Sequence, residues 1–200
     1  GGKLRDDLIS KYGTYAKQNG KLFYVMYGQT EATARMSYLP PDDLMNNIGS
    51  IGKAINNGKF KLDKDTSELI YQGPNIFGGY ANCLDDLSYF KQIEELKTGE
   101  IARVDEMGFY YITGRRKRIV KVFGNRINLD ELESLVSKYF NELYYCVGWM
   151  DKMILIFSTN QSCKSNEIVN WLSQEYKLHR SIFKVEIIDF LPLTANGKTD

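Results

Sequence analysis

The chain has 200 residues, of which 43% are hydrophobic and 13% aromatic, and its 26 basic residues nearly cancel its 25 acidic ones. So many apolar side chains predict a globular protein with one large core or two small ones, rather than a disordered chain. The near-neutral charge gives no reason to expect a nucleic acid or an anionic membrane as a partner.

Cysteine and histidine usage argues against a structural zinc site. Cys83, Cys146 and Cys163 are far apart, and the chain has a single histidine, His179. A sparse, odd set of cysteines fits a reducing cytosol. No apolar run approaches the ~20 residues of a membrane helix, and Gly1-Gly2-Lys3 opens no signal peptide. We therefore expect a cytoplasmic protein with no membrane span.

The first segment predicts a helix, then a strand, then a polar cluster. Apolar residues recur at helical spacing between Gly1 and Lys21. Leu22 to Met26 is a β-prone apolar run that predicts a buried strand. Tyr27-Gly28-Gln29-Thr30-Glu31 follows directly. Because α/β folds place ligands just past the carboxyl ends of strands, this cluster is a candidate binding site.

From Ile48 to about Thr113, short β-type segments alternate with glycine turns, which predicts a small antiparallel barrel or sheet. Leu84 to Leu96 is expected to form a helix or loop between two of the strands. The predicted strands are Phe60-Lys61-Leu62, Glu68-Leu69-Ile70-Tyr71, Glu100-Ile101-Ala102-Arg103-Val104 and Gly108-Phe109-Tyr110-Tyr111-Ile112.

A second unit is expected to begin near Gly114. Its basic run, Arg115 to Arg118, has little to bury and predicts a solvated linker or hinge. A strand (119–123), a turn at Gly124-Asn125 and a helix with Asp130 near its start follow. Two strands (144–149 and 153–158), a helix (165–176) and a last strand (184–190) complete the pattern. This alternation predicts a compact α/β or α+β domain.

The Tyr27 to Glu31 cluster contains groups that suit a nucleotide. A tyrosine ring can stack on a flat base, and Gly28 permits close backbone approach. Thr30 offers a hydroxyl to a phosphate oxygen, and Glu31 offers a hard oxygen ligand to Mg²⁺. The same five residues also fit an ordinary polar turn after a strand.

Two further positions carry candidate chemistry. Glu100 follows the turn Thr98-Gly99, where a carboxylate can accept both hydroxyls of a ribose, although such acids are usually just solvated. Lys198 lies in a Gly-Lys-Thr triplet similar to a phosphate loop, but that loop needs glycine where Pro192 stands. A lysine on such a glycine-containing loop is most often only a surface charge.

The order of these motifs is similar to that of the adenylate-forming superfamily, which includes acyl-CoA synthetases, adenylation domains of nonribosomal peptide synthetases and beetle luciferases. Ser67-Glu68-Leu69-Ile70 resembles the family's Gly-Glu-Leu strand, with serine in place of glycine. Gly1-Gly2 resembles the turn that borders its nucleotide site. The other matching stretches are Tyr27 to Glu31, Gly78-Gly79-Tyr80, Thr98-Gly99-Glu100, Gly114 to Ile127 and Leu191 to Lys198.

The resemblance implies a mixed α/β and α+β fold. Residues 1–116 would be the C-terminal part of the large ATP-binding domain, a strand and helix plus a small β-barrel-like subdomain. Residues 117–200 would be the small, mobile C-terminal lid domain with the catalytic lysine. The implied activity is ATP-dependent activation of a carboxylic acid to an acyl-adenylate with release of pyrophosphate, followed by transfer to a thiol.

The resemblance also assigns roles to individual residues. Lys198 would bridge the attacking carboxylate and the α-phosphate of ATP, and Lys117 would be the hinge about which the lid domain rotates. The remaining roles are Gly1 and Gly2 beside the nucleotide, Tyr27 and Gly28 at adenine, Thr30 at a phosphate, Glu31 on Mg²⁺, Glu100 and Arg115 on the ribose, and Lys121 and Gly124 on the loop that faces the thiol tunnel.

The implied partners are ATP/AMP, Mg²⁺, a small carboxylic acid, and either CoA or the phosphopantetheine of an acyl or peptidyl carrier protein. The chain departs from the family pattern at Glu100, where aspartate is usual, and at Asp130, where glycine is common. The family's phosphate loop and most of its acyl pocket have no match in these 200 residues. We therefore expect an incomplete enzyme, inactive alone; the alternative is a non-catalytic nucleotide-sensing or partner-docking module.

Overall fold

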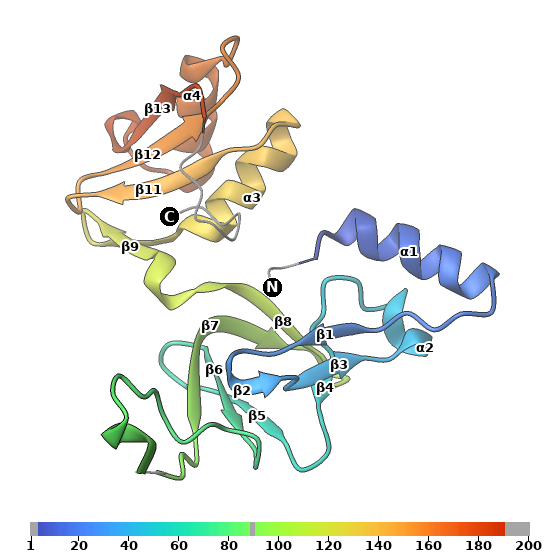
Figure 1. Cartoon of the computed structure of the whole chain (residues 1–200). Helices are drawn as coiled ribbons and strands as arrows, with labels where there is room; N and C mark the ends of the chain where they lie inside the picture. Colours follow the sequence, from blue (N-terminus) through green and yellow to red (C-terminus); the bar gives the residue numbers. More distant parts are fainter. Residues whose placement is uncertain (1–3, 89–90, 191–200) are drawn as a thin grey trace. The chain divides into compact units, whose positions relative to one another are not determined.

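The structure, a computed structural model, describes residues 4–88 and 91–190 (Figure 1). The chain divides into two compact units, Gly1–Thr113 (unit 1) and Gly114–Asp200 (unit 2). This division lies where the sequence pattern predicted the start of a second unit, near Gly114, whereas the family resemblance placed the boundary between 116 and 117. Among the described residues, no helix is both long and apolar enough to cross a membrane.

Unit 1 begins with the predicted helix, α1 (Asp6–Gln18). Asp6 and Asp7 lie in its first turn, where a carboxylate is favoured by the helix dipole. The helix packs closely on a short second helix, α2 (Pro41–Leu44). A Cβ at Gly13 would lie 2.6 Å from Cδ2 of Leu44, so the glycine permits this approach.

A three-stranded antiparallel sheet follows, in the order β1-β3-β4. Its strands are β1 (Val25–Tyr27), β3 (Ser37–Leu39) and β4 (Lys53–Ala54), and β2 (Glu31–Ala34) lies between β1 and β3 in the chain. The predicted buried strand from Leu22 to Met26 is wrong in extent and burial, because Leu22 is 72% exposed and Met26 48% exposed. In the described part of the chain, β1 is an edge strand, so part of its surface stays uncovered.

The four predicted β segments form one sheet in the order β5-β6-β7-β8, which confirms the antiparallel sheet expected here. Its core includes Phe60, Leu69, Tyr71 and Ala102. The segment between β6 and β7 holds a short 3-10 helix, Asp85–Ser88, and is otherwise loop where described. The strands are β5 (Lys59–Leu62), β6 (Glu68–Gln72), β7 (Leu96–Val104) and β8 (Tyr110–Arg115).

Ser67 explains one departure from the family pattern. It has φ +56°, a left-handed conformation that favours glycine, and it lies directly before β6. Its N–H donates to the Asp63 carbonyl at 2.9 Å, which closes the turn. The backbone at residue 67 thus has the conformation that suits the glycine of the family's Gly-Glu-Leu strand, although this chain has serine there.

We predict that Ser67→Gly raises the free energy of unfolding of unit 1 by about 0.5–1 kcal/mol. Removing Cβ relieves a left-handed strain of ~1–2 kcal/mol, partly offset by the greater freedom of glycine in the unfolded chain. Urea denaturation measures the change. Ser67→Ala keeps Cβ and should give no such gain; equal stabilisation by both variants would contradict this explanation.

Unit 2 has the predicted α+β pattern. A β-hairpin precedes a three-stranded sheet in the order β11-β12-β13, antiparallel in the first pair and parallel in the second. Both helices bury apolar faces against it, through Leu132 and Val136 of α3 and Ile168 and Leu172 of α4. The elements are β9 (Ile119–Val122), β10 (Asn125–Asn128), α3 (Leu129–Phe140), β11 (Tyr145–Trp149), β12 (Met153–Ser158), α4 (Ser165–Tyr176) and β13 (Phe183–Ile187), with 3-10 helices at Arg116–Arg118 and Arg180–Ile182.

The hairpin turn lies one residue earlier than predicted. Asn125 pairs with Val122 in the ladder, so the two turn residues are Phe123 and Gly124 rather than Gly124 and Asn125. Their φ angles are +47° and +83°. A type I′ turn, one of the two types that match the strand twist, has positive φ at both central positions, which explains the glycine.

Candidate active site

In unit 1, the Thr98-Gly99-Glu100 segment forms an irregularity in β7. Glu68 pairs with Ile101 and Ile70 with Lys97, so extra residues bulge from β7 between these pairs. Gly99 has φ +75°, and its N–H donates to the buried Glu68 carboxylate at 3.1 Å. Because a bulge redirects side chains out of the regular ladder, it sets the direction of Glu100.

Gln29 joins this bulge to the Tyr27 segment. Its Nε2 donates to the Thr98 carbonyl at 2.9 Å and to the Tyr27 hydroxyl at 3.2 Å. Burial raises the pKa of Tyr27, and the nearby Glu100 carboxylate raises it further. The structure thus brings together Tyr27, Gln29 and Glu100. Gln29 was not predicted, because it occupies the variable position of the Tyr-Gly-x-Thr-Glu motif.

The raised pKa of Tyr27 predicts a loss of stability at high pH. Above about pH 10 the unfolded chain gives up this phenolic proton while the folded chain keeps it. The folded state then binds more protons, so the free energy of unfolding falls as pH rises. Tyr27→Phe should make this fall shallower between about pH 9 and pH 11, measured by urea denaturation at each pH.

The exposed Tyr15 of α1 supplies the matched control, Tyr15→Phe, which should keep the wild-type slope. Burial also raises the pKa values of Tyr71 and Tyr110, so the slope should shrink rather than vanish. A Tyr27→Phe slope equal to that of the wild type would contradict the assignment.

The Glu31 side chain contacts Tyr80, which belongs to the Gly78-Gly79-Tyr80 motif. The Tyr80 hydroxyl donates to the Glu31 carboxylate, and this hydrogen bond raises the pKa of Tyr80. The Glu31 carbonyl accepts from the Phe77 N–H at 2.8 Å. Residues 4–88 and 91–190 hold no group of three or more His, Cys, Asp or Glu side chains placed to share a metal. The role of Glu31 as a Mg²⁺ ligand stays a prediction.

Gly28 and Thr30 have local roles in the turn after β1. A Cβ at Gly28 would lie 2.6 Å from the Ala34 carbonyl oxygen, so the close approach expected there is made by the chain's own backbone. Thr30 is exposed, and its carbonyl accepts from the Thr33 N–H at 3.3 Å. Their contacts with adenine and phosphate stay predictions.

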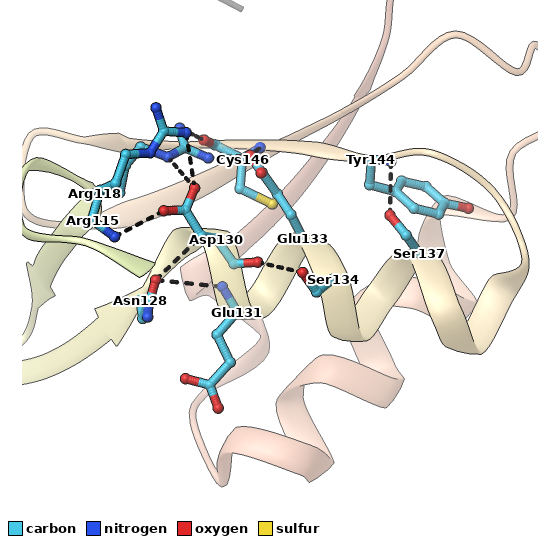
Figure 2. Close-up of polar contacts among 10 residues, drawn as sticks. All are labelled: Arg115, Arg118, Asn128, Asp130, Glu131, Glu133, Ser134, Ser137, Tyr144 and Cys146. Atoms are coloured by element: carbon cyan, nitrogen blue, oxygen red, sulfur yellow. Dashed lines mark hydrogen bonds and ion pairs between the residues drawn. The ribbon is translucent and has the colours of Figure 1, made fainter. Parts of the chain in front are cut away.

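The basic run at the start of unit 2, Arg115 to Arg118, was expected to be a solvated linker. This expectation is wrong for Arg118, whose side chain is partly buried and paired. Its side chain is 23% exposed and donates to Asp130 through Nε at 3.0 Å and to the Cys146 carbonyl through Nη1 at 3.0 Å. It also pairs with Glu133 (Figure 2). Burial raises the pKa of Glu133, opposed by the Cys146 N–H and by Arg118. The first turn of α3 can hold the partly buried Arg118 because the Asp130 and Glu133 carboxylates neutralise its charge.

Arg115, the ribose candidate, contacts the same aspartate. Its backbone N–H donates to Asp130 Oδ2 at 3.0 Å, and its Nη2 lies 3.4 Å from Asp130 Oδ1. Arg115 belongs to unit 2 and Glu100 to unit 1, so their joint action on a ribose stays a prediction.

The other predicted residues of unit 2 lie apart from this network. Lys117 is exposed within the 3-10 helix, and Lys121 is exposed on β9 opposite Arg126. Gly124 is at the hairpin tip. Gly1, Gly2 and Lys198 lie outside the described residues, so their roles stay predictions.

Comparison with known proteins agrees with this arrangement of motifs. No model of a known protein family matches the chain. The 2-succinylbenzoate–CoA ligase of Staphylococcus epidermidis is 27% identical over 217 residues, covering 99% of this chain and 43% of that protein. This similarity supports the resemblance to the adenylate-forming superfamily that the motif order indicated.

Solved structures of adenylate-forming enzymes share the fold. O-succinylbenzoate coenzyme A synthetase from Bacillus subtilis, in complex with the acyl-adenylate OSB-AMP, matches with a TM-score of 0.74 and 23% identity, over 100% of this chain and 43% of that one. Amide bond synthetase McbA from Marinactinospora thermotolerans matches with a TM-score of 0.67 and 18% identity, over 96% and 43%. The chain thus corresponds to the C-terminal part of such enzymes and spans less than half of their length.

Proposed function

We propose that the protein containing this chain activates a small carboxylic acid with ATP and transfers the acyl group to CoA. A carboxylate oxygen attacks the α-phosphorus of ATP, the bond to the β-phosphate breaks, and pyrophosphate leaves. The thiol sulfur then attacks the acyl carbon, loses its proton, and displaces AMP. The observation that carries the proposal is the similarity to 2-succinylbenzoate–CoA ligases along 99% of the chain.

The residues of unit 1 suit the nucleotide. The Glu100 carboxylate, directed by the bulge, can accept hydrogen bonds from ribose hydroxyls. Glu31, held by Tyr80, can contribute one oxygen to Mg²⁺ beside the phosphates. Mg²⁺ supplies positive charge that stabilises the phosphoryl oxygens during transfer. Related solved structures include complexes with AMP and with ATP and magnesium, which supports this set of ligands.

Lys198 is the proposed catalytic residue. Negative charge crowds the α-phosphorus as the carboxylate approaches, so a lysine that touches both groups lowers the repulsion between them. In unit 2, Lys121 and Gly124 on the β9–β10 hairpin are the proposed contacts for the incoming thiol, and Lys117 is the proposed hinge.

The relatives named as CoA ligases favour CoA over a carrier protein as the acceptor. They also make 2-succinylbenzoate the first acid to test. The full-length protein should show acid-dependent exchange of pyrophosphate into ATP and should form a thioester with CoA. Absence of exchange with a panel of aromatic and aliphatic acids would contradict the proposal.

We predict that Lys198→Ala in the full-length protein lowers the rate of pyrophosphate exchange by about a hundredfold or more, as expected for a charge that acts on the transition state. The exposed Lys152 provides a control, and Lys152→Ala should exchange at the wild-type rate. Normal exchange by Lys198→Ala would contradict the role given to Lys198.

A further inference from the structure

Asp130 contacts the chain on both sides of the proposed hinge residue. Its carboxylate accepts from the Arg115 N–H at 3.0 Å, two residues before Lys117, and from Arg118 Nε at 3.0 Å, one residue after it. The Arg115 guanidinium lies 3.4 Å away as well. Figure 2 shows both arginines meeting this one side chain.

Asp130 is itself held rigidly. It lies at the start of α3, where the Asn128 side chain caps its N–H at 3.1 Å and the helix dipole favours a negative charge. Its side chain is only 19% exposed. Arg118 links it to Glu133 and to the Cys146 carbonyl of β11, so Asp130 is connected to the core of unit 2.

The chain just before Arg115 is packed against the same region. A Cβ at Gly114 would lie 2.3 Å from Nδ2 of Asn128, so the backbone passes directly over the cap of α3. Within unit 2, Gly114 thus packs against Asn128, and Arg115 is hydrogen-bonded to Asp130. A rotation about Lys117 would change the direction of the chain between Arg115 and Arg118. The Asp130 carboxylate would then lose its contact with Arg115, with Arg118 or with both.

We propose that Asp130 is a positioning residue that latches the chain across Lys117 and holds residues 115 to 118 in the backbone conformation that they have within unit 2. The proposal rests on the proposed function, because it assumes that the two half-reactions use different rotations of the small domain. The latch also holds Arg115 near α3, so its opening would release the candidate ribose ligand. The position is one where glycine is common in the superfamily, and a glycine would form no such latch.

The first test is amide hydrogen exchange in the full-length protein, read at Arg115. Asp130→Ala removes the acceptor of the Arg115 N–H, and exchange there should become faster by about tenfold or more. Glu131→Ala is the matched control, because Glu131 is the next acid on the same helix turn and its side chain points away from the arginines (Figure 2). It should leave exchange at Arg115 unchanged.

The second test compares the two half-reactions. Asp130→Ala should change the ratio of the acyl-adenylate formation rate to the CoA transfer rate by about threefold or more, whereas Glu131→Ala should preserve it. Asp130→Glu, which keeps the charge, should move the ratio back toward the wild type. If Asp130→Ala misfolds, Asp130→Ser serves in both tests, because it has no carboxylate to accept from Arg115 and Arg118.

The outcomes separate the two proposals. Unchanged amide hydrogen exchange at Arg115 in Asp130→Ala would overturn the latch. Faster hydrogen exchange with an unchanged ratio of the two half-reaction rates, including an equal loss in both, would overturn it as well. A wild-type protein without pyrophosphate exchange would overturn the proposed function and the latch's role in it. The amide hydrogen exchange at Arg115 would still report on the Asp130 contact itself.

Discussion

The hydrogen bond from the Gln29 amide to the Thr98 carbonyl joins two segments that lie 69 residues apart in sequence. One segment carries Tyr27 and Glu31, and the other carries Glu100 on its bulge. Because the same amide also donates to the Tyr27 hydroxyl, a single side chain fixes both sides of the cluster. The candidate nucleotide site of unit 1 depends on this bond, since each segment alone is only a turn beside a strand.

In unit 1 a side-chain amide connects segments that are far apart in sequence, whereas in unit 2 ion pairs make such connections. Arg118 connects Asp130, Glu133 and the Cys146 carbonyl, so the start of the unit is attached to its helix and its sheet. A half-buried arginine between two carboxylates is sensitive to the loss of either partner, because the remaining charges stay partly desolvated. Such a network gives the linker defined positions rather than free motion, which suits a segment proposed to switch between two rotations.

Patterns within short segments predicted much of this fold. Hydrophobic periodicity located α1, α3 and α4, and glycine turns marked the strands of the four-stranded sheet. The errors came from effects at longer range. The burial predicted for Leu22 to Met26 depends on neighbouring strands, and the anchoring of Arg118 depends on acids 12 and 15 residues away. Motif order indicated Glu31, Tyr80 and Glu100, but the contact between Tyr80 and Glu31 and the part played by Gln29 became visible only in the structure.

The central claim is that the cluster joined by Gln29 and Thr98 binds the ribose of the nucleotide through Glu100. Calorimetric titration of the full-length protein with AMP and with 2′,3′-dideoxy-AMP tests it most directly. We predict that Glu100→Ala weakens AMP binding by about tenfold or more, the loss expected when hydrogen bonds to a carboxylate are removed, and leaves the weaker dideoxy-AMP binding unchanged. An equal effect on both nucleotides, or no effect on AMP, would contradict the account.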